Sequence, residues 1–220
     1  MNTSSKLNLA AFLPQSCANG PGLRSVLWVQ GCSLRCAGCF NPDFQPFSGG
    51  YESAVDEVIA LLLAQPDTEG VSFSGGEPFA QAAALAEVAE AIRTAGKGVL
   101  IFTGQEAATL EVSRNPGVQR LLAATDLLAA GPYRHDLPQR HPLLASTNQE
   151  LVYLTERYRG VELGSRRSEF RIGVNGGVTA TGFPVVVQAV SSCSQHVGRA
   201  LPDAILDGGQ SPPYKNACSI

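Results

Sequence analysis

The stretch WVQGCSLRCAGCFNPD, residues 28–43, holds half of the chain's six cysteines, with Cys32, Cys36 and Cys39 inside eight positions. Thiolates are soft ligands that suit iron–sulfur clusters and zinc. A structural zinc site is closed by four ligands, yet the nearest other cysteine, Cys17, lies fifteen residues before Cys32 and no histidine is near. In a [4Fe–4S] cluster each of the four irons normally binds one cysteine. Three cysteines would therefore hold such a cluster and leave one iron open to a ligand.

A zinc knuckle or a set of buried thiols is the simpler alternative, because free cysteine is among the most buried residue types. Packing explains poorly why three cysteines share one glycine-containing loop directly after an apolar run. That run, RSVLWVQ (24–30), is short and β-branched and predicts a strand. The sequence therefore favours a metal-binding loop at the end of a strand.

Strands and helices alternate along the chain. Apolar residues at 55, 58, 59 and 62 follow one helical face, and Ser53 with Asp56 resembles a capping box at its start. A similar helical pattern lies between 77 and 95. A third covers 106–124, broken near 115–117, and a fourth covers 148–158. The other expected strands are 71–76, 96–104 and 125–133, a polar loop covers 134–147, and residues 168–183 predict a hairpin.

This alternation indicates βαβ units and a parallel sheet. No dinucleotide fingerprint follows the first strand, and the units are too few for a complete eight-stranded barrel. We expect an α/β protein built as a partial, open β/α barrel with a C-terminal β-hairpin. The barrel domain is expected over residues 1–184. The extension 185–220 ends in a segment rich in Gly, Pro and Ser and is expected to be a poorly structured tail.

Composition and charge exclude several classes of protein. The net charge of -3 does not indicate a nucleic-acid-binding surface. No apolar run approaches the ~20 residues that span a bilayer. Residues 1–16 faintly resemble a signal peptide, but Asn8 interrupts the apolar stretch and Pro14 ends it. We expect a cytoplasmic protein that binds neither nucleic acid nor a membrane.

The cysteine loop resembles the cluster motif of the radical S-adenosylmethionine (SAM) superfamily. The segment GPGLRSVLWVQGCSLRCAGCFNPD is most similar to glycyl-radical activating enzymes, above all to the small activases of anaerobic ribonucleotide reductase. The shared residues are Gly20, Pro21, Gly22, Arg24, Gly31, Gly38, Asn41 and Pro42. The resemblance implies a radical SAM type of partial barrel, a [4Fe–4S] cluster on Cys32, Cys36 and Cys39, and SAM on the open iron. It implies reductive cleavage of SAM to a 5′-deoxyadenosyl radical, hence a radical SAM oxidoreductase.

A second motif, SFSGGEP (72–78), follows the second expected strand. Gly75 and Gly76 permit a close approach of the backbone to a ligand, and the Glu77 carboxylate suits charge-assisted hydrogen bonds to an ammonium group. The alternative is a plain strand-to-helix turn in which Glu77 favours the helix dipole. The motif resembles the superfamily's binding site for the SAM amino group, and so implies that Gly75, Gly76 and Glu77 contact SAM.

Further candidates lie at the ends of the later strands, where catalytic groups of β/α barrels gather. The segment ending in Thr103 and Gly104 resembles a Tyr-Thr-Gly segment of the activases, which implies SAM-side residues; an ordinary strand end is the alternative. Residues 145–149, ASTNQ, also resemble a segment of the small activases. They suggest no role beyond helix capping by Asn148. Cys17, Cys193 and Cys218 are expected to be spectator thiols rather than ligands of an auxiliary cluster.

Three functions fit these observations. The resemblance favours an activase that abstracts hydrogen from a glycine of a partner glycyl-radical enzyme, with flavodoxin or ferredoxin as electron donor. A radical SAM enzyme that modifies a small molecule, such as a deazaguanine precursor, or a peptide would share the Gly-Gly-Glu-Pro motif. A non-catalytic iron–sulfur carrier or sensor would have no need of that motif.

Overall fold

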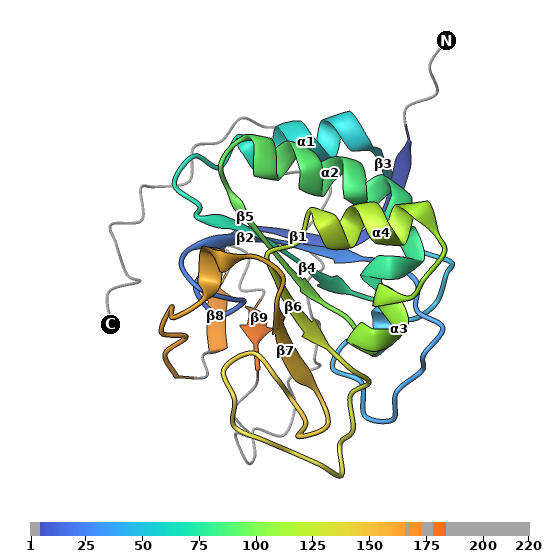
Figure 1. Ribbon diagram of the computed structural model, residues 1–220, viewed down its shortest axis with the longest axis vertical. Helices are drawn as coiled ribbons and strands as arrows, with labels where there is room; N and C mark the ends of the chain where they lie inside the picture. The colour runs from blue at the N-terminus through green and yellow to red at the C-terminus, as the bar shows by residue number, and fades with distance from the viewer. Residues whose placement is uncertain (1–4, 166–167, 173–177, 184–220) are drawn as a thin grey trace.

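The main sheet of the protein has seven strands in the order β3-β1-β2-β4-β5-β6-β7 (Figure 1). The computed structural model describes residues 5–165, 168–172 and 178–183. The four central strands β2, β4, β5 and β6 are parallel, and β1, β3 and β7 run antiparallel to their neighbours. The strands are β1 (Lys6–Ser16), β2 (Arg24–Val29), β3 (Tyr51–Ala54), β4 (Gly70–Gly75), β5 (Gly98–Phe102), β6 (Leu127–Ala130) and β7 (Glu150–Tyr153).

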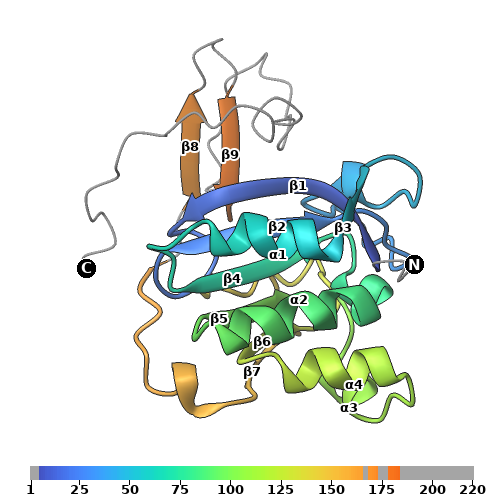
Figure 2. The same ribbon diagram turned by 90° about the horizontal axis from the view of Figure 1, so that it is seen from above.

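Helices cover one face of this sheet (Figures 1 and 2). Helix α1 (Val55–Leu63) precedes β4, α2 (Ala82–Thr94) joins β4 to β5, and α3 (Ala107–Glu111) with α4 (Pro116–Ala123) joins β5 to β6. Because the parallel strands lie in chain order and such crossovers are right-handed, the helices fall on the same side. The arrangement is that of an open β/α sheet, so the expected α/β fold class is confirmed.

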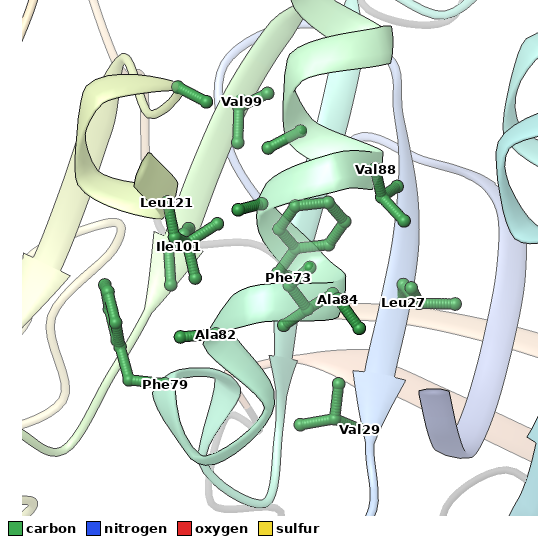
Figure 3. Close-up of a cluster of buried hydrophobic side chains, with 14 of the residues drawn as sticks. Leu27, Val29, Phe73, Phe79, Ala82, Ala84, Val88, Val99, Ile101 and Leu121 are labelled. Carbon is green, nitrogen blue, oxygen red and sulfur yellow. The ribbon is translucent and has the colours of Figure 1, made fainter. Parts of the chain in front are cut away.

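The parallel strands are buried on both faces, as strands in such sheets usually are. On the helix side, Phe73 of β4 and Ile101 of β5 belong to one cluster with Val88 of α2 and Leu121 of α4 (Figure 3). Loops cover the opposite face, where Trp28 packs with Phe44 in one cluster and Leu100 with Leu143 and Tyr158 in another. Burial of each large apolar side chain contributes about 2 kcal/mol, so the sheet is a rigid support for the loops at its ends.

The helix starts are capped by residues close to those expected. At α1, Glu57 Oε2 accepts hydrogen bonds from Ala54 N at 3.1 Å and Ser53 Oγ at 3.0 Å. The expected partner of Ser53, Asp56, is therefore wrong by one residue. The expected break near 115–117 is confirmed, because α4 begins at Pro116 and Asn115 Oδ1 accepts from Gly117 N at 2.9 Å.

Three strands of the main sheet, β1, β3 and β7, were not predicted from the sequence. Residues 6–16 form β1, whose apolar side chains at Leu7, Leu9, Ala11 and Leu13 are buried in alternation. Their period of two identifies a strand, although the segment also resembles the start of a signal peptide. The short β3 pairs with β1 and leads directly into α1.

The expected helix at 148–158 is wrong. Residues 150–153 form β7, which pairs antiparallel with β6, and Glu156–Tyr158 form a short 3₁₀ helix, η3. The run LVYL is short, β-branched and aromatic, and such a run does not separate helix from strand by periodicity. The segment forms a strand because the edge of β6 offers backbone hydrogen-bond partners to it.

Arg24 lies at the start of β2, at the end of the sheet opposite the cysteine loop. Its guanidinium is fully buried and donates to Glu69 Oε2 at 2.6 Å, Tyr158 OH at 2.7 Å and the carbonyl oxygens of Val71 at 2.6 Å and Gly98 at 3.1 Å. At Gly20 a Cβ would lie 2.7 Å from Arg24 Cδ. Arg24, with Gly20 packed against it, therefore holds the starts of β2, β4 and β5 together. Neither residue borders the cysteine loop.

The expected hairpin is confirmed as a separate two-stranded sheet of β8 (Ser168–Ile172) and β9 (Val178–Gly182), apart from the main sheet (Figure 2). It is tied to the chain before β2 by hydrogen bonds from Cys17 N to Glu169 Oε1 at 2.6 Å and from Asn19 Nδ2 to Thr181 Oγ1 at 2.9 Å. The expected tail at 185–220 lies outside the described residues. Within the described ranges, no helix has the length and apolar character needed to cross a membrane.

Candidate functional site

The loops that follow the parallel strands meet at one end of the sheet. Glu77 N donates to Gly31 O at 2.9 Å and Gly76 N donates to Val29 O at 2.8 Å, so the Gly-Gly-Glu segment lies against the start of the cysteine loop. Thr103 N donates to Ala129 O at 2.9 Å on the other side. The structure thus brings the candidate segments after β2, β4 and β5 together at the carboxyl ends of the strands.

The two glycines of the second motif are required by this contact between loops. Gly75 has a φ of +106°, and a Cβ on it would lie 2.5 Å from the backbone of Val29. A Cβ on Gly76 would lie 2.3 Å from Gly31 O. Both distances are too short for any side chain to be accommodated. The sequence suggested that Gly75 and Gly76 let the backbone approach a ligand. In the structure these glycines let the backbone approach the start of the cysteine loop.

Glu77 is the buried acid at the centre of the site, with 2% of its surface exposed. Its Oε1 accepts from Phe79 N at 3.0 Å and Thr103 Oγ1 at 2.8 Å, and its Oε2 accepts from Gly104 N at 3.0 Å. Burial raises the pKa of Glu77, and these hydrogen bonds oppose the rise. The carboxylate also caps the 3₁₀ helix η2 (Pro78–Gln81). Thr103 and Gly104 hold Glu77 in place, a role that the sequence did not indicate.

The three cysteines of the loop are each partly exposed. Burial raises the pKa of the Cys32 thiol, with Glu77 adding to the rise, while the backbone N–H groups of Leu34 and Arg35 lower it. Asn41 N donates to Cys39 Sγ at 3.4 Å. Backbone donors aimed at sulfur stabilise thiolates, the form that binds metal.

These residues fit a [4Fe–4S] cluster. In such a cluster each thiolate holds its own iron, and the chain offers three partly exposed thiols on one loop. The carboxylate of Glu77 lies near enough to raise the pKa of Cys32.

The loop after β6 forms another wall of the site. The ring centroids of Phe40 and Tyr133 lie 4.7 Å apart, and a Cβ on Gly38, whose φ is +70°, would lie 3.3 Å from His135 Cβ. Gly38 therefore leaves room for residues 133–135 beside the cysteines. This contact could not be predicted from the sequence, because it joins segments nearly a hundred residues apart.

Asn148, for which the sequence suggested only helix capping, and Gln149, for which it suggested no role, hold the loop after β6 in place. Gln149 Oε1 accepts from Ala145 N at 2.9 Å and its Nε2 donates to Gly131 O at 2.9 Å. Asn148 Nδ2 donates to Pro132 O at 2.8 Å, and Asn148 is not a helix cap because the residues after it form strand β7. Both residues fix the path of the loop directly after β6.

Of the remaining cysteines, only Cys17 lies within the described residues. Cys17 is disulfide-bonded, so the expectation of a spectator thiol is wrong for this residue. It also lies before β2, at the opposite end of the strand from the cysteine loop. The expectations for Cys193 and Cys218 lie outside the described residues.

Residues 18–152 match the family model described as a 4Fe-4S single cluster domain. The chain belongs to this family. It is 31% identical over 135 residues to the anaerobic ribonucleoside-triphosphate reductase-activating protein of Vibrio cholerae, a match that covers 58% of this chain and 84% of the relative. The Escherichia coli K12 protein of the same name is 26% identical over 158 residues, covering 67% of this chain and 98% of the relative.

Other relatives are longer than the region in which they match this chain. The pyruvate formate-lyase-activating enzyme of Clostridium pasteurianum is 39% identical over 90 residues, covering 39% of this chain and 38% of the relative. Together these relatives confirm the radical SAM assignment, the enzyme class and the two cofactors, a [4Fe–4S] cluster and SAM. A solved structure of QueE from Escherichia coli aligns with a TM-score of 0.38 at 13% identity, covering 57% of this chain and 70% of that one.

Proposed function

We propose that this radical SAM protein activates a partner enzyme by generating a glycyl radical on it. The observation that carries the proposal is the contact between the two motifs. The loop bearing Cys32, Cys36 and Cys39 is hydrogen-bonded to the Gly-Gly-Glu segment through Gly31 and Glu77. Thiolates for a cluster and a buried carboxylate for an ammonium group are thereby held side by side.

When bound, the cluster and SAM supply one-electron cleavage of the C5′–S bond, which yields methionine and a 5′-deoxyadenosyl radical. The residues of the chain bind and orient. Cys32, Cys36 and Cys39 hold three irons, and Glu77 orients the SAM amino group. Because Glu77 is buried and has an acceptor atom fixed by Gly104 N, an ammonium placed beside it gains a charge-assisted hydrogen bond in a site with little water.

The partner is proposed from the relatives, whose names describe activation of anaerobic ribonucleoside-triphosphate reductase and pyruvate formate-lyase. By analogy, the hydrogen abstracted by the 5′-deoxyadenosyl radical comes from a backbone glycine of such an enzyme. The electron comes from a low-potential carrier, flavodoxin or ferredoxin.

The test begins with anaerobic reconstitution and quantitation of iron and sulfide. Loaded protein incubated with dithionite and SAM is expected to release 5′-deoxyadenosine, and addition of a glycyl-radical enzyme is expected to produce a glycyl-radical signal in electron paramagnetic resonance (EPR) spectra. A Cys36→Ser variant, which removes one ligand, serves as the control and is expected to do neither. Release of no 5′-deoxyadenosine by fully loaded wild-type protein refutes the radical SAM chemistry. Release without a radical on any candidate enzyme refutes the activase function alone.

A further inference from the structure

Gln30, the residue directly before Gly31, is buried with 6% of its surface exposed. Its side-chain Nε2 donates to Asp43 O at 3.1 Å and to Pro46 O at 2.8 Å. One amide group thus holds the far end of the cysteine loop through two carbonyl oxygens. Asp43 and Pro46 follow the three cysteines in the chain and Gln30 precedes them, so this side chain joins the two ends of the loop.

The backbone closes the loop at the same place. Gly31 N donates to Phe44 O at 2.8 Å and Cys32 N donates to Gln45 O at 2.8 Å. Together with the bonds of Gln30, four hydrogen bonds join residues 30–32 to residues 43–46. The loop that carries the three cysteines is therefore a closed ring whose closure uses no sulfur atom.

Gln81 anchors this ring to the second motif. Its Oε1 accepts from Asn8 N at 2.7 Å, and its Nε2 donates to Asn8 O at 2.8 Å and to Gln30 O at 3.0 Å. Gln81 ends η2, the 3₁₀ helix that Glu77 caps. The base of the cysteine loop is therefore held from two sides, by strand β1 and by the Gly-Gly-Glu segment.

We infer that Gln30 is a positioning residue for the iron–sulfur cluster: it closes the cysteine loop before any metal binds, so that the three thiols are presented together. The inference rests on the proposed function for the identity of the bound group. Ordering a loop at the moment of binding weakens binding, and a loop ordered in advance avoids that loss. Gln30 thereby raises the affinity for the cluster without touching it.

The test uses Gln30→Met, which keeps the side-chain length and removes both donors. Gln119→Met is the matched control, because Gln119 Nε2 also donates to backbone carbonyls, those of Leu110, Glu111 and Ser113, and closes the connection between α3 and α4. The first readout is hydrogen exchange at the amides of Gly31 and Cys32 in metal-free protein. The second is the rate at which a chelator removes iron from reconstituted protein, and the third is the EPR spectrum of the reduced cluster with and without SAM.

Gln30→Met is expected to raise exchange and iron loss about thirtyfold. That factor corresponds to about 2 kcal/mol, the worth of two ordinary hydrogen bonds, if opening is fast relative to chelation. The change that SAM causes in the EPR spectrum is expected to weaken. Gln119→Met should leave all three readouts unchanged.

Unchanged exchange and unchanged iron loss in Gln30→Met would overturn the inference. If that variant does not fold, the wild-type protein still decides: exchange of Gly31 and Cys32 at unprotected rates in metal-free protein shows that the loop is not closed in advance. Failure of wild-type protein to take up a four-iron cluster is a separate result, which refutes the proposed function while the exchange data still report on loop closure.

Discussion

Replacement of Arg24 by Met should destabilise the protein strongly and leave the site chemistry intact. The guanidinium has no exposed surface, and it pairs with Glu69, donates to Tyr158 OH, and satisfies the carbonyls of Val71 and Gly98. Removal of one partner of a buried ion pair typically costs about 3–5 kcal/mol. Here Glu69 stays 35% exposed and can be rehydrated, which lowers the cost, while the buried carbonyls lose their donors, which raises it. We therefore expect a loss of about 4 kcal/mol in the free energy of unfolding.

For a chain of this length, that loss corresponds to a decrease in Tm of about 8–16 °C. The assay is urea unfolding of metal-free protein in the cold, followed by circular dichroism, with Arg120→Met as control. Arg120 forms an exposed pair with Glu90, and such pairs contribute little. The cluster-loaded, folded fraction of Arg24→Met should bind SAM with wild-type affinity, because Arg24 lies at the opposite end of β2 from the cysteines.

Two results would refute this reasoning. A loss below about 1 kcal/mol in the free energy of unfolding would mean that the buried hydrogen bonds of Arg24 do not stabilise the starts of the strands. A SAM affinity reduced tenfold in the folded fraction would mean that Arg24 acts on the site, as its place in a segment shared with the activases would otherwise suggest.

Two further predictions concern the site itself. Because burial raises the pKa of Glu77 and an ammonium binds only the ionised acid, the affinity of cluster-loaded protein for SAM should rise with pH as Glu77 ionises. The Glu77→Gln variant should bind more weakly and without that dependence. Calorimetric titrations from about pH 5 to 8 measure both, and equal pH slopes would contradict the role of Glu77. Gly76→Ala places a Cβ 2.3 Å from Gly31 O and should cost about 1–3 kcal/mol. Gly49→Ala meets no atom within 4 Å, but Gly49 has a φ of +92°, so its loss reflects backbone strain alone. A loss in Gly76→Ala no larger than that in Gly49→Ala in urea unfolding would count against the loop contact.

Much of the fold follows from local pattern. Strand β4 and helix α2 were predicted because apolar periodicity, glycine and proline all mark the same boundaries. Strand β7 was not, since LVYL is compatible with either structure until β6 offers an edge. Strand β1 was missed although Leu7, Leu9, Ala11 and Leu13 alternate, because its start also resembles the apolar region of a leader.

The residues of the candidate site also fall into two groups, those that the sequence pattern indicates and those that only the fold reveals. The cysteines and Glu77 could be predicted as site residues because metal ligation and charge recognition require those residue types at short spacing. The partners of Glu77 and the roles of Gln30, Gln81 and Gln149 were not found. Glutamine carries no spacing signal, and its bonds here reach backbone atoms of segments that only the fold brings near. Gly38 was recognised as a motif residue, but the reason for it is the loop at Tyr133 and His135.

The order of strands in the sheet has a consequence for synthesis of the chain. After β3, which pairs with β1 at the other edge, every new strand of the main sheet is added at the same growing edge, β4 beside β2, then β5, β6 and β7. No later strand must be inserted between two earlier ones, so each unit can dock as it leaves the ribosome. The cysteine loop and the residues that close it, 30–46, are complete before the Gly-Gly-Glu segment is made. We expect the nascent chain to present its three thiols on a closed loop while most of the sheet is still to be translated. Protection of the Cys32 amide from hydrogen exchange on stalled chains would measure this.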